Sequence, residues 1–92
     1  MSVITRLEDK GDAPVAKVAV SPIFHGGIGE SYQVEVWRNA HGLYSVGVQE
    51  NPKGCEGDWH TVGRRMLLSD AIALAERHYL EQTEGEVEPQ AA

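Results

Sequence analysis

The sequence predicts an α+β domain with one antiparallel sheet of three to five strands and a single C-terminal helix packed on one face. Apolar and polar residues alternate on both sides of a short glycine-containing turn between residues 32 and 49, which is typical of a hairpin. Apolar residues then recur at helical spacing between residues 68 and 79. Because the chain has only 92 residues, we expect one domain.

The first part of the chain is expected to contribute little regular structure. Residues 1–13 are rich in charge and lack periodicity, so they predict a mobile N-terminal segment with a short extended piece around Val3 and Ile4. The apolar residues between Pro14 and Val20 predict a first strand. The segment 21–29 contains a proline and three glycines and predicts a loop.

The central hairpin can be given a register. A three-residue loop at 40–42, with its glycine in the left-handed conformation, places Val36 opposite Val46 and Val34 opposite Val48. A loop of two or four residues would set these valines against polar positions and lose the shared apolar face. We therefore expect four valines on one face of the sheet.

A second loop, a last strand and the helix complete the expected domain, which spans residues 14–83. Proline and glycine place residues 51–58 in a loop, and a strand follows from Trp59 to about Arg65. Ser69 is the expected N-cap of a helix from Asp70 to about Gln82. Its apolar stripe, expected to pack on the valine face, consists of Leu68, Ala71, Ile72, Ala75 and Tyr79.

Residues 84–92 are acidic and lack an apolar face, which predicts a disordered tail. The formal net charge of the chain is −6, and residues 79–92 contain four acidic residues and no Lys or Arg. The expected domain is therefore closer to neutral than the chain as a whole. This distribution makes DNA mimicry by a uniformly negative surface the less favoured hypothesis.

The sequence also favours a reducing compartment. Cys55 is the single cysteine, so no internal disulfide can form, and the expected setting is the cytoplasm. The longest apolar run, Ala71 to Ala75, is too short for a membrane span, and the N-terminus lacks the apolar stretch of a secretion signal.

No motif indicates a catalytic, cofactor or metal site. The glycines after His25 lack the flanking residues of a nucleotide loop, and a flexible turn explains them. Cys55 and His60 lack the further Cys or His partners of a structural zinc site, since the other histidines fall in a loop, a turn and the helix. We expect no enzyme activity, no cofactor, no metal and no small-molecule substrate.

Trp37 is the first candidate for partner binding. The alternation places its side chain on the face opposite the valines, where an exposed tryptophan would be a binding anchor. The alternative is that the loop containing Ile23 and Phe24 folds over that face and buries Trp37.

Basic residues are the second candidate. Arg64 and Arg65 end the last expected strand, Lys53 lies in the preceding loop, Arg38 lies at the tip of the hairpin and Arg77 lies on the helix. If they converge, they form a basic spot that can hold a phosphate or a carboxylate. The alternative is a set of arginines that only solvate the surface.

Two resemblances bear on function. The hairpin, the further strand with Gly63-Arg64-Arg65 and the helix from Ser69 resemble the sheet and last helix of a double-stranded RNA-binding domain, over about half the chain. That family begins its last helix with lysines that contact phosphates, whereas this chain has Ser69 and Asp70. The family's RNA-binding residues therefore do not transfer to this sequence.

The chain as a whole resembles the small phage-encoded anti-CRISPR proteins that inhibit type I surveillance complexes. The resemblance rests on the hairpin from Tyr32 to Glu50, the helix from Ser69 to Gln82, the acidic end and the size. It implies a protein in the host cytoplasm that binds a protein–RNA complex and its guide RNA and blocks target DNA.

We therefore expect a non-enzymatic inhibitor or adaptor that binds a larger protein or ribonucleoprotein complex. The expected contact residues are Trp37, Arg38, Lys53, Arg64 and Arg65. The alternative hypothesis is a small nucleic-acid-binding module that uses Lys53, Arg64 and Arg65 on loops at the edge of the sheet.

Overall fold

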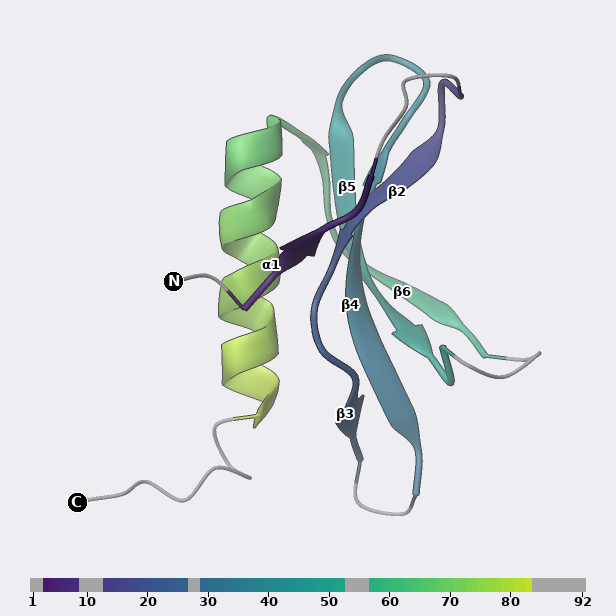
Figure 1. Ribbon diagram of the computed structural model, residues 1–92, viewed down its shortest axis with the longest axis vertical. Helices are drawn as coiled ribbons and strands as arrows, with labels where there is room; N and C mark the ends of the chain where they lie inside the picture. The colour runs from purple at the N-terminus through teal and green to yellow at the C-terminus, as the bar shows by residue number, and fades with distance from the viewer. Residues whose placement is uncertain (1–2, 9–12, 27–28, 53–56, 84–92) are drawn as a thin grey trace.

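The computed structural model describes residues 3–8, 13–26, 29–52 and 57–83, and it confirms the α+β class. Within these ranges, six strands precede one helix. Figure 1 shows the helix beside the sheet. Lys53, Cys55 and the tail 84–92 lie outside the described residues. The elements are β1 (Thr5–Arg6), β2 (Ala16–Val20), β3 (Phe24–His25), β4 (Ser31–Arg38), β5 (Tyr44–Glu50), β6 (Trp59–Met66) and α1 (Leu68–Thr83).

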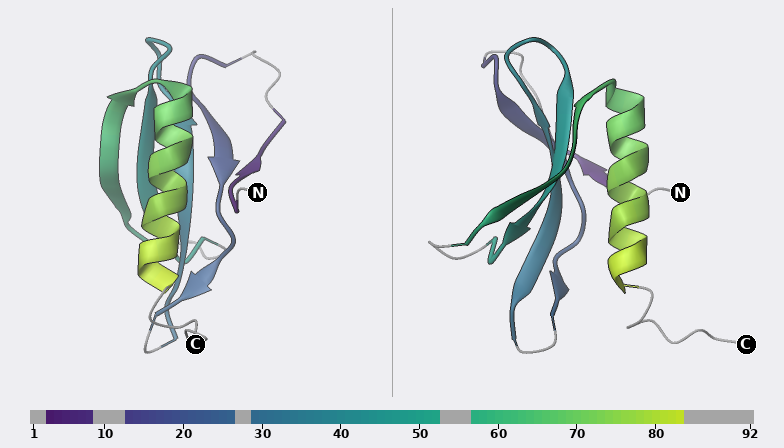
Figure 2. Two further views of the ribbon diagram at one scale, coloured as in Figure 1. Left: turned by 90° about the vertical axis from the view of Figure 1, so that its left-hand side faces the viewer. Right: turned by 180° about the vertical axis from the view of Figure 1, so that it is seen from behind.

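The strands form one sheet in the order β1-β2-β4-β5-β6, and β3 pairs with the beginning of β4. All pairings are antiparallel. Helix α1 contacts β4, β5 and β6 from one side, so the molecule has two layers (Figure 2). No helix in the described part of the chain is long and apolar enough to cross a membrane.

The predicted register of the β4–β5 hairpin is confirmed. Val36 pairs with Val46 and Val34 pairs with Val48. The loop has the expected length, because the N–H of Asn39 donates to the carbonyl of Leu43 at 2.8 Å, and Gly42 has a φ of 81°. The amide oxygen of Asn39 also accepts the N–H groups of residues 41 and 43, which fixes the turn further.

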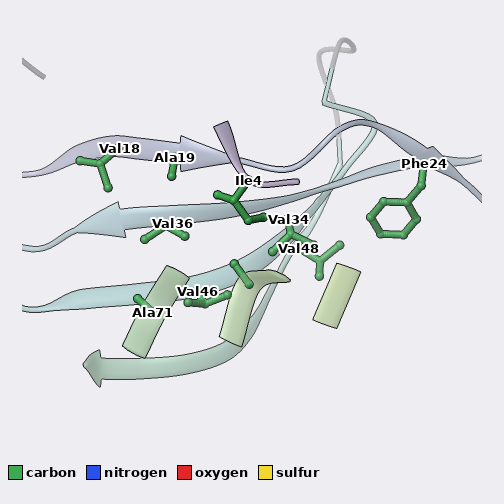
Figure 3. Packing of buried hydrophobic residues seen from close by; sticks show 10 residues of the cluster. Ile4, Val18, Ala19, Phe24, Val34, Val36, Val46, Val48 and Ala71 are labelled. Carbon is green, nitrogen blue, oxygen red and sulfur yellow. The ribbon is translucent and has the colours of Figure 1, made fainter. Parts of the chain in front are cut away.

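The core lies between the sheet and the helix. Val34, Val36 and Val46 are fully buried, and so are Ala71 and Ala75 of α1. Figure 3 shows the three valines on the sheet and Ala71 on the helix. The small alanine side chains allow the helix to approach the valines closely. The rest of the predicted stripe, Leu68, Ile72 and Tyr79, packs against this core.

The packed part of the chain also includes residues N-terminal to position 14. Ile4 has an exposed fraction of only 8% and belongs to the core, and the neighbouring Thr5 and Arg6 pair with β2. The short extended piece expected around Val3 and Ile4 therefore lies just before an actual strand, β1.

The expected N-cap was wrong. The N–H of Ala71 donates to the carbonyl of Leu67 at 2.9 Å, so the helix begins at Leu68 and Ser69 lies within its first turn. Leu68 packs against the core, which favours a helix that already includes this residue. Asp70 remains in the first turn, where its negative charge interacts favourably with the helix dipole.

Strand β6 forms one edge of the sheet and is irregular. Its pairing with β5 shifts twice, once at Val62 and once at the pair Arg64 and Arg65. Arg65 has a φ of 60°, in the left-handed region that non-glycine residues seldom adopt. Such bulges twist an edge strand and disfavour pairing with another chain.

The packing of the valine face predicts a selective loss of stability. Val36→Ala should lower the free energy of unfolding by about 2 kcal/mol, because it removes buried methyl groups and leaves a cavity. The same substitution at Val15, which is 50% exposed, should change it by less than about 0.5 kcal/mol. Urea denaturation measures both, and equal losses would contradict this location of the core.

Candidate functional site

The face of the sheet opposite α1 carries both tryptophans of the chain. In the register, Trp37 pairs with Lys17 on one side and with Ser45 on the other. Glu35 pairs with Gly47, two residues along on the same face. No described element covers this face (Figure 2). We call it the tryptophan face, formed by Lys17, Glu35, Trp37, Ser45, Gly47, Trp59 and Thr61.

The two tryptophans pack against each other. Their ring centroids are 6.3 Å apart and the rings are nearly perpendicular, at 89°. Trp59 lies directly over Gly47, where an added Cβ atom would be only 2.2 Å from the indole ring. Trp59 remains 37% exposed and Trp37 is half-buried, so the pair presents aromatic surface to solvent. Gly47 is thus required for the close approach of Trp59.

The alternative in which the loop containing Ile23 and Phe24 covers Trp37 is wrong. Phe24 lies on the helix side of the sheet, where its ring contacts Tyr79 at a centroid distance of 5.6 Å. Trp37 is partly covered by Trp59 of β6, which the sequence analysis had not placed near it. The pairing of Gly47 with Thr61 brings β6 next to β5, and this register could not be deduced because β6 contains two bulges.

A buried carboxylate orients Trp37. The side chain of Glu35 is only 3% exposed, and it accepts a hydrogen bond from the indole Nε1–H of Trp37 at 2.9 Å. The Lys17 ammonium lies 3.3 Å from the other carboxylate oxygen and 5.9 Å from the centroid of the Trp37 ring. The charge of Glu35 is thus paired and hydrogen-bonded, as a buried charge requires. These contacts restrict the rotamer of Trp37.

Three of the predicted basic residues lie at one end of the sheet. Arg38 pairs with Tyr44, which pairs with Met66, so the end of β4 and the end of β6 share one row. Arg64 and Arg65 occupy the bulge next to this row and are exposed. The guanidinium of Arg38 also donates to the carbonyl of Ala13. We call this region the basic end.

The structure places four of the five predicted contact residues, Trp37, Arg38, Arg64 and Arg65, toward one end of the sheet. Because side chains alternate along β4, Trp37 and Arg38 point to opposite faces, and Arg38 lies in the helix-side row of Tyr44 and Met66. Lys53 lies outside the described residues. Trp59, Glu35 and Lys17 were not among the predicted contact residues. Glu35 precedes Trp37 by two residues in β4, so alternation along the strand puts both side chains on one face and is the signal in the sequence that points to Glu35.

Three of the four histidines line a cavity near the opposite end of the sheet, on the helix side. The cavity has a volume of about 430 Å³. The sequence alone placed His25, His41 and His78 in a loop, a turn and the helix, so it did not predict that His25 and His78 would meet His60. The fourth, His41, lies in the hairpin turn. We call this the histidine cavity; its lining includes His25, His60, His78, Tyr32 and Glu50.

The histidine cavity lies in negatively charged surroundings. The Nε2 atom of His60 is 2.6 Å from a carboxylate oxygen of Glu50. Desolvation raises the pKa of Tyr32, and the negative charges of Glu30 and Glu50 raise it further. Arg38, Arg64 and Arg65 thus lie at one end of the strands, whereas the carboxylates of Glu30 and Glu50 lie with the histidines at the other end.

No family model, no curated protein and no solved structure matches this chain.

The contact between Gly47 and Trp59 predicts a spectroscopic change. Gly47→Ala should displace Trp59 from its place beside Trp37, because the new methyl group would overlap the ring. We expect more efficient acrylamide quenching of tryptophan fluorescence and a loss of about 1 kcal/mol of stability. Ser45→Ala, on the same strand and face, should leave the quenching unchanged, and equal effects would contradict the contact.

The raised pKa of Tyr32 predicts a loss of stability at alkaline pH. The folded state favours the neutral phenol, so this stabilisation is present below about pH 10 and is lost as the pH rises through the raised pKa. Urea denaturation should therefore show the wild type losing stability relative to Tyr32→Phe above about pH 10. If the difference in unfolding free energy between the wild type and Tyr32→Phe stayed constant through this pH range and above it, the prediction would be contradicted.

Proposed function

We propose that this protein is a non-enzymatic inhibitor or adaptor that binds a larger protein or ribonucleoprotein complex through the tryptophan face. The observation that supports this proposal most strongly is the placement of both tryptophans side by side on the face that α1 leaves uncovered. Tryptophan is enriched among the residues that contribute most to binding at protein interfaces.

The two tryptophan side chains of the tryptophan face are held in place before any partner binds. Glu35 and Lys17 hold Trp37, and Gly47 allows Trp59 to pack beside it. Side chains that are already ordered lose less conformational entropy when a partner binds. The surrounding polar residues would then form the hydrated rim of the interface.

The basic end supports a mixed interface. Its guanidinium groups can form paired hydrogen bonds with phosphates or carboxylates of the partner. In the specific form suggested by the resemblance to anti-CRISPR proteins, the tryptophan face contacts a protein subunit of a type I surveillance complex. The arginines then contact its guide RNA in the host cytoplasm.

The basic end also favours one alternative, a nucleic-acid-binding module. Arg38, Arg64 and Arg65 lie at the same end of the sheet, as a phosphate-binding surface requires. Fluorescence anisotropy with free RNA and DNA separates the two hypotheses. The inhibitor should not bind the free nucleic acids, whereas the module should bind them with an affinity that falls as salt rises.

Thr61 provides a direct test of the binding face. Thr61 is exposed and pairs with Gly47, so an arginine there would obstruct the tryptophan face without entering the core. Thr61→Arg should weaken partner binding at least tenfold. Leu80→Arg, at a position of α1 that is 42% exposed, introduces the same charge and size elsewhere and should leave binding intact.

The measurement compares the wild type with both variants. Purified type I surveillance complex is mixed with labelled target DNA, and the fraction of bound DNA is followed as each protein is added. In parallel, proteins captured from the host lysate are quantified by mass spectrometry. Failure of the wild type to reduce DNA binding would contradict the anti-CRISPR form. A partner captured equally by all three proteins would contradict the assignment of the face.

A further inference from the structure

We propose that Glu50, Asp58 and His60 form a Zn²⁺ site at the edge of the histidine cavity. The proposal does not depend on the function proposed above, because this site lies away from the basic end and on the opposite side of the sheet from the tryptophan face. One oxygen from each carboxylate and one imidazole nitrogen lie within 4.8 Å of one another.

The backbone places these three side chains on one face of the sheet. The N–H of Glu50 donates to the carbonyl of Asp58 at 2.9 Å, which continues the β5–β6 ladder beyond the pair Gln49 and Trp59. Glu50 and Asp58 are therefore direct neighbours across the strands. His60 follows Asp58 by two residues and shares its face. A ladder of paired strands thus holds the three donors.

The spacing of the donors suits a small metal ion. Bonds of about 2.0–2.2 Å in a tetrahedral site place the donor atoms about 3.3 Å apart. The Nε2 atom of His60 is now 2.6 Å from the Oε2 atom of Glu50, so this pair would need to open by less than 1 Å. The side chains of Glu50 and His60 are 33% and 57% exposed, which leaves them free to make this adjustment.

The electrostatics also favour a cation. Glu50 and Asp58 bring two negative charges to directly opposite positions, which is unfavourable in a sheet without a compensating charge. A divalent cation would neutralise this charge more fully than His60 can.

The donor set favours Zn²⁺ over Ca²⁺ or Mg²⁺. Those two ions prefer a shell of oxygen atoms, whereas Zn²⁺ binds imidazole nitrogen and carboxylate oxygen readily. Three protein donors leave a fourth position for water or another side chain. Glu50 and His60 also line the histidine cavity with His25 and His78, so there is space for that fourth ligand.

The test is a titration of the full chain with Zn²⁺, followed by isothermal calorimetry. We expect one ion per chain and a Kd below about 100 μM. His60→Gln and Asp58→Asn should each weaken binding at least tenfold. The matched control is His41→Gln, which removes a histidine from the hairpin turn and should leave the affinity unchanged. Circular dichroism checks that each variant is folded.

A second variant separates the proposed site from the single thiol. Cys55 lies outside the described residues, so the same titrations are repeated in Cys55→Ser. Binding that persists in Cys55→Ser and is lost in His60→Gln supports the site. The absence of binding to the wild type up to about 1 mM Zn²⁺ would overturn it. Binding that survives His60→Gln but disappears in Cys55→Ser would also overturn it.

Discussion

The pairing register of β4 and β5 is the constraint on which the rest of the structure depends. It sets Val34 opposite Val48 and Val36 opposite Val46, which gives α1 a continuous apolar surface to cover. Because side chains alternate along a strand, the same register sends Glu35, Trp37 and Gly47 to the other face. A shift of one residue would bury a charged glutamate and a tryptophan beneath the helix. The core and the tryptophan face are therefore two consequences of one pairing.

The sequence was informative where local chemistry decides the structure. The glycine of the hairpin turn and the alternation of valines predicted the β4–β5 register, and helical spacing predicted the stripe that packs on it. Sequence reasoning failed where distant segments meet. The two bulges of β6 change its register, so the position of Trp59 over Gly47 could not be deduced from alternation. The meeting of His25, His60 and His78 was missed because it depends on contacts between β3, β6 and α1, which are far apart in the sequence.

The candidate site was predictable only for residues of the hairpin and of the strand that follows it. Trp37 and Arg38 follow from the hairpin register, and the exposed pair Arg64 and Arg65 ends the strand beside it. The partner that covers Trp37 was assigned to the wrong loop, since the apolar character of Phe24 does not reveal which face of the sheet it occupies. Packing against Tyr79 places Phe24 on the helix side. Phe24 therefore does not cover the opposite face of the sheet, which carries Trp37.

The central claim is that this open face is the surface that contacts a partner. Acrylamide quenching of tryptophan fluorescence in the free protein and in the purified complex tests it most directly, because both tryptophans of the chain lie there. If a partner covers the face, quenching should fall substantially on binding, once the partner's own tryptophan signal is subtracted. Unchanged quenching in a saturated complex would show that the partner binds elsewhere.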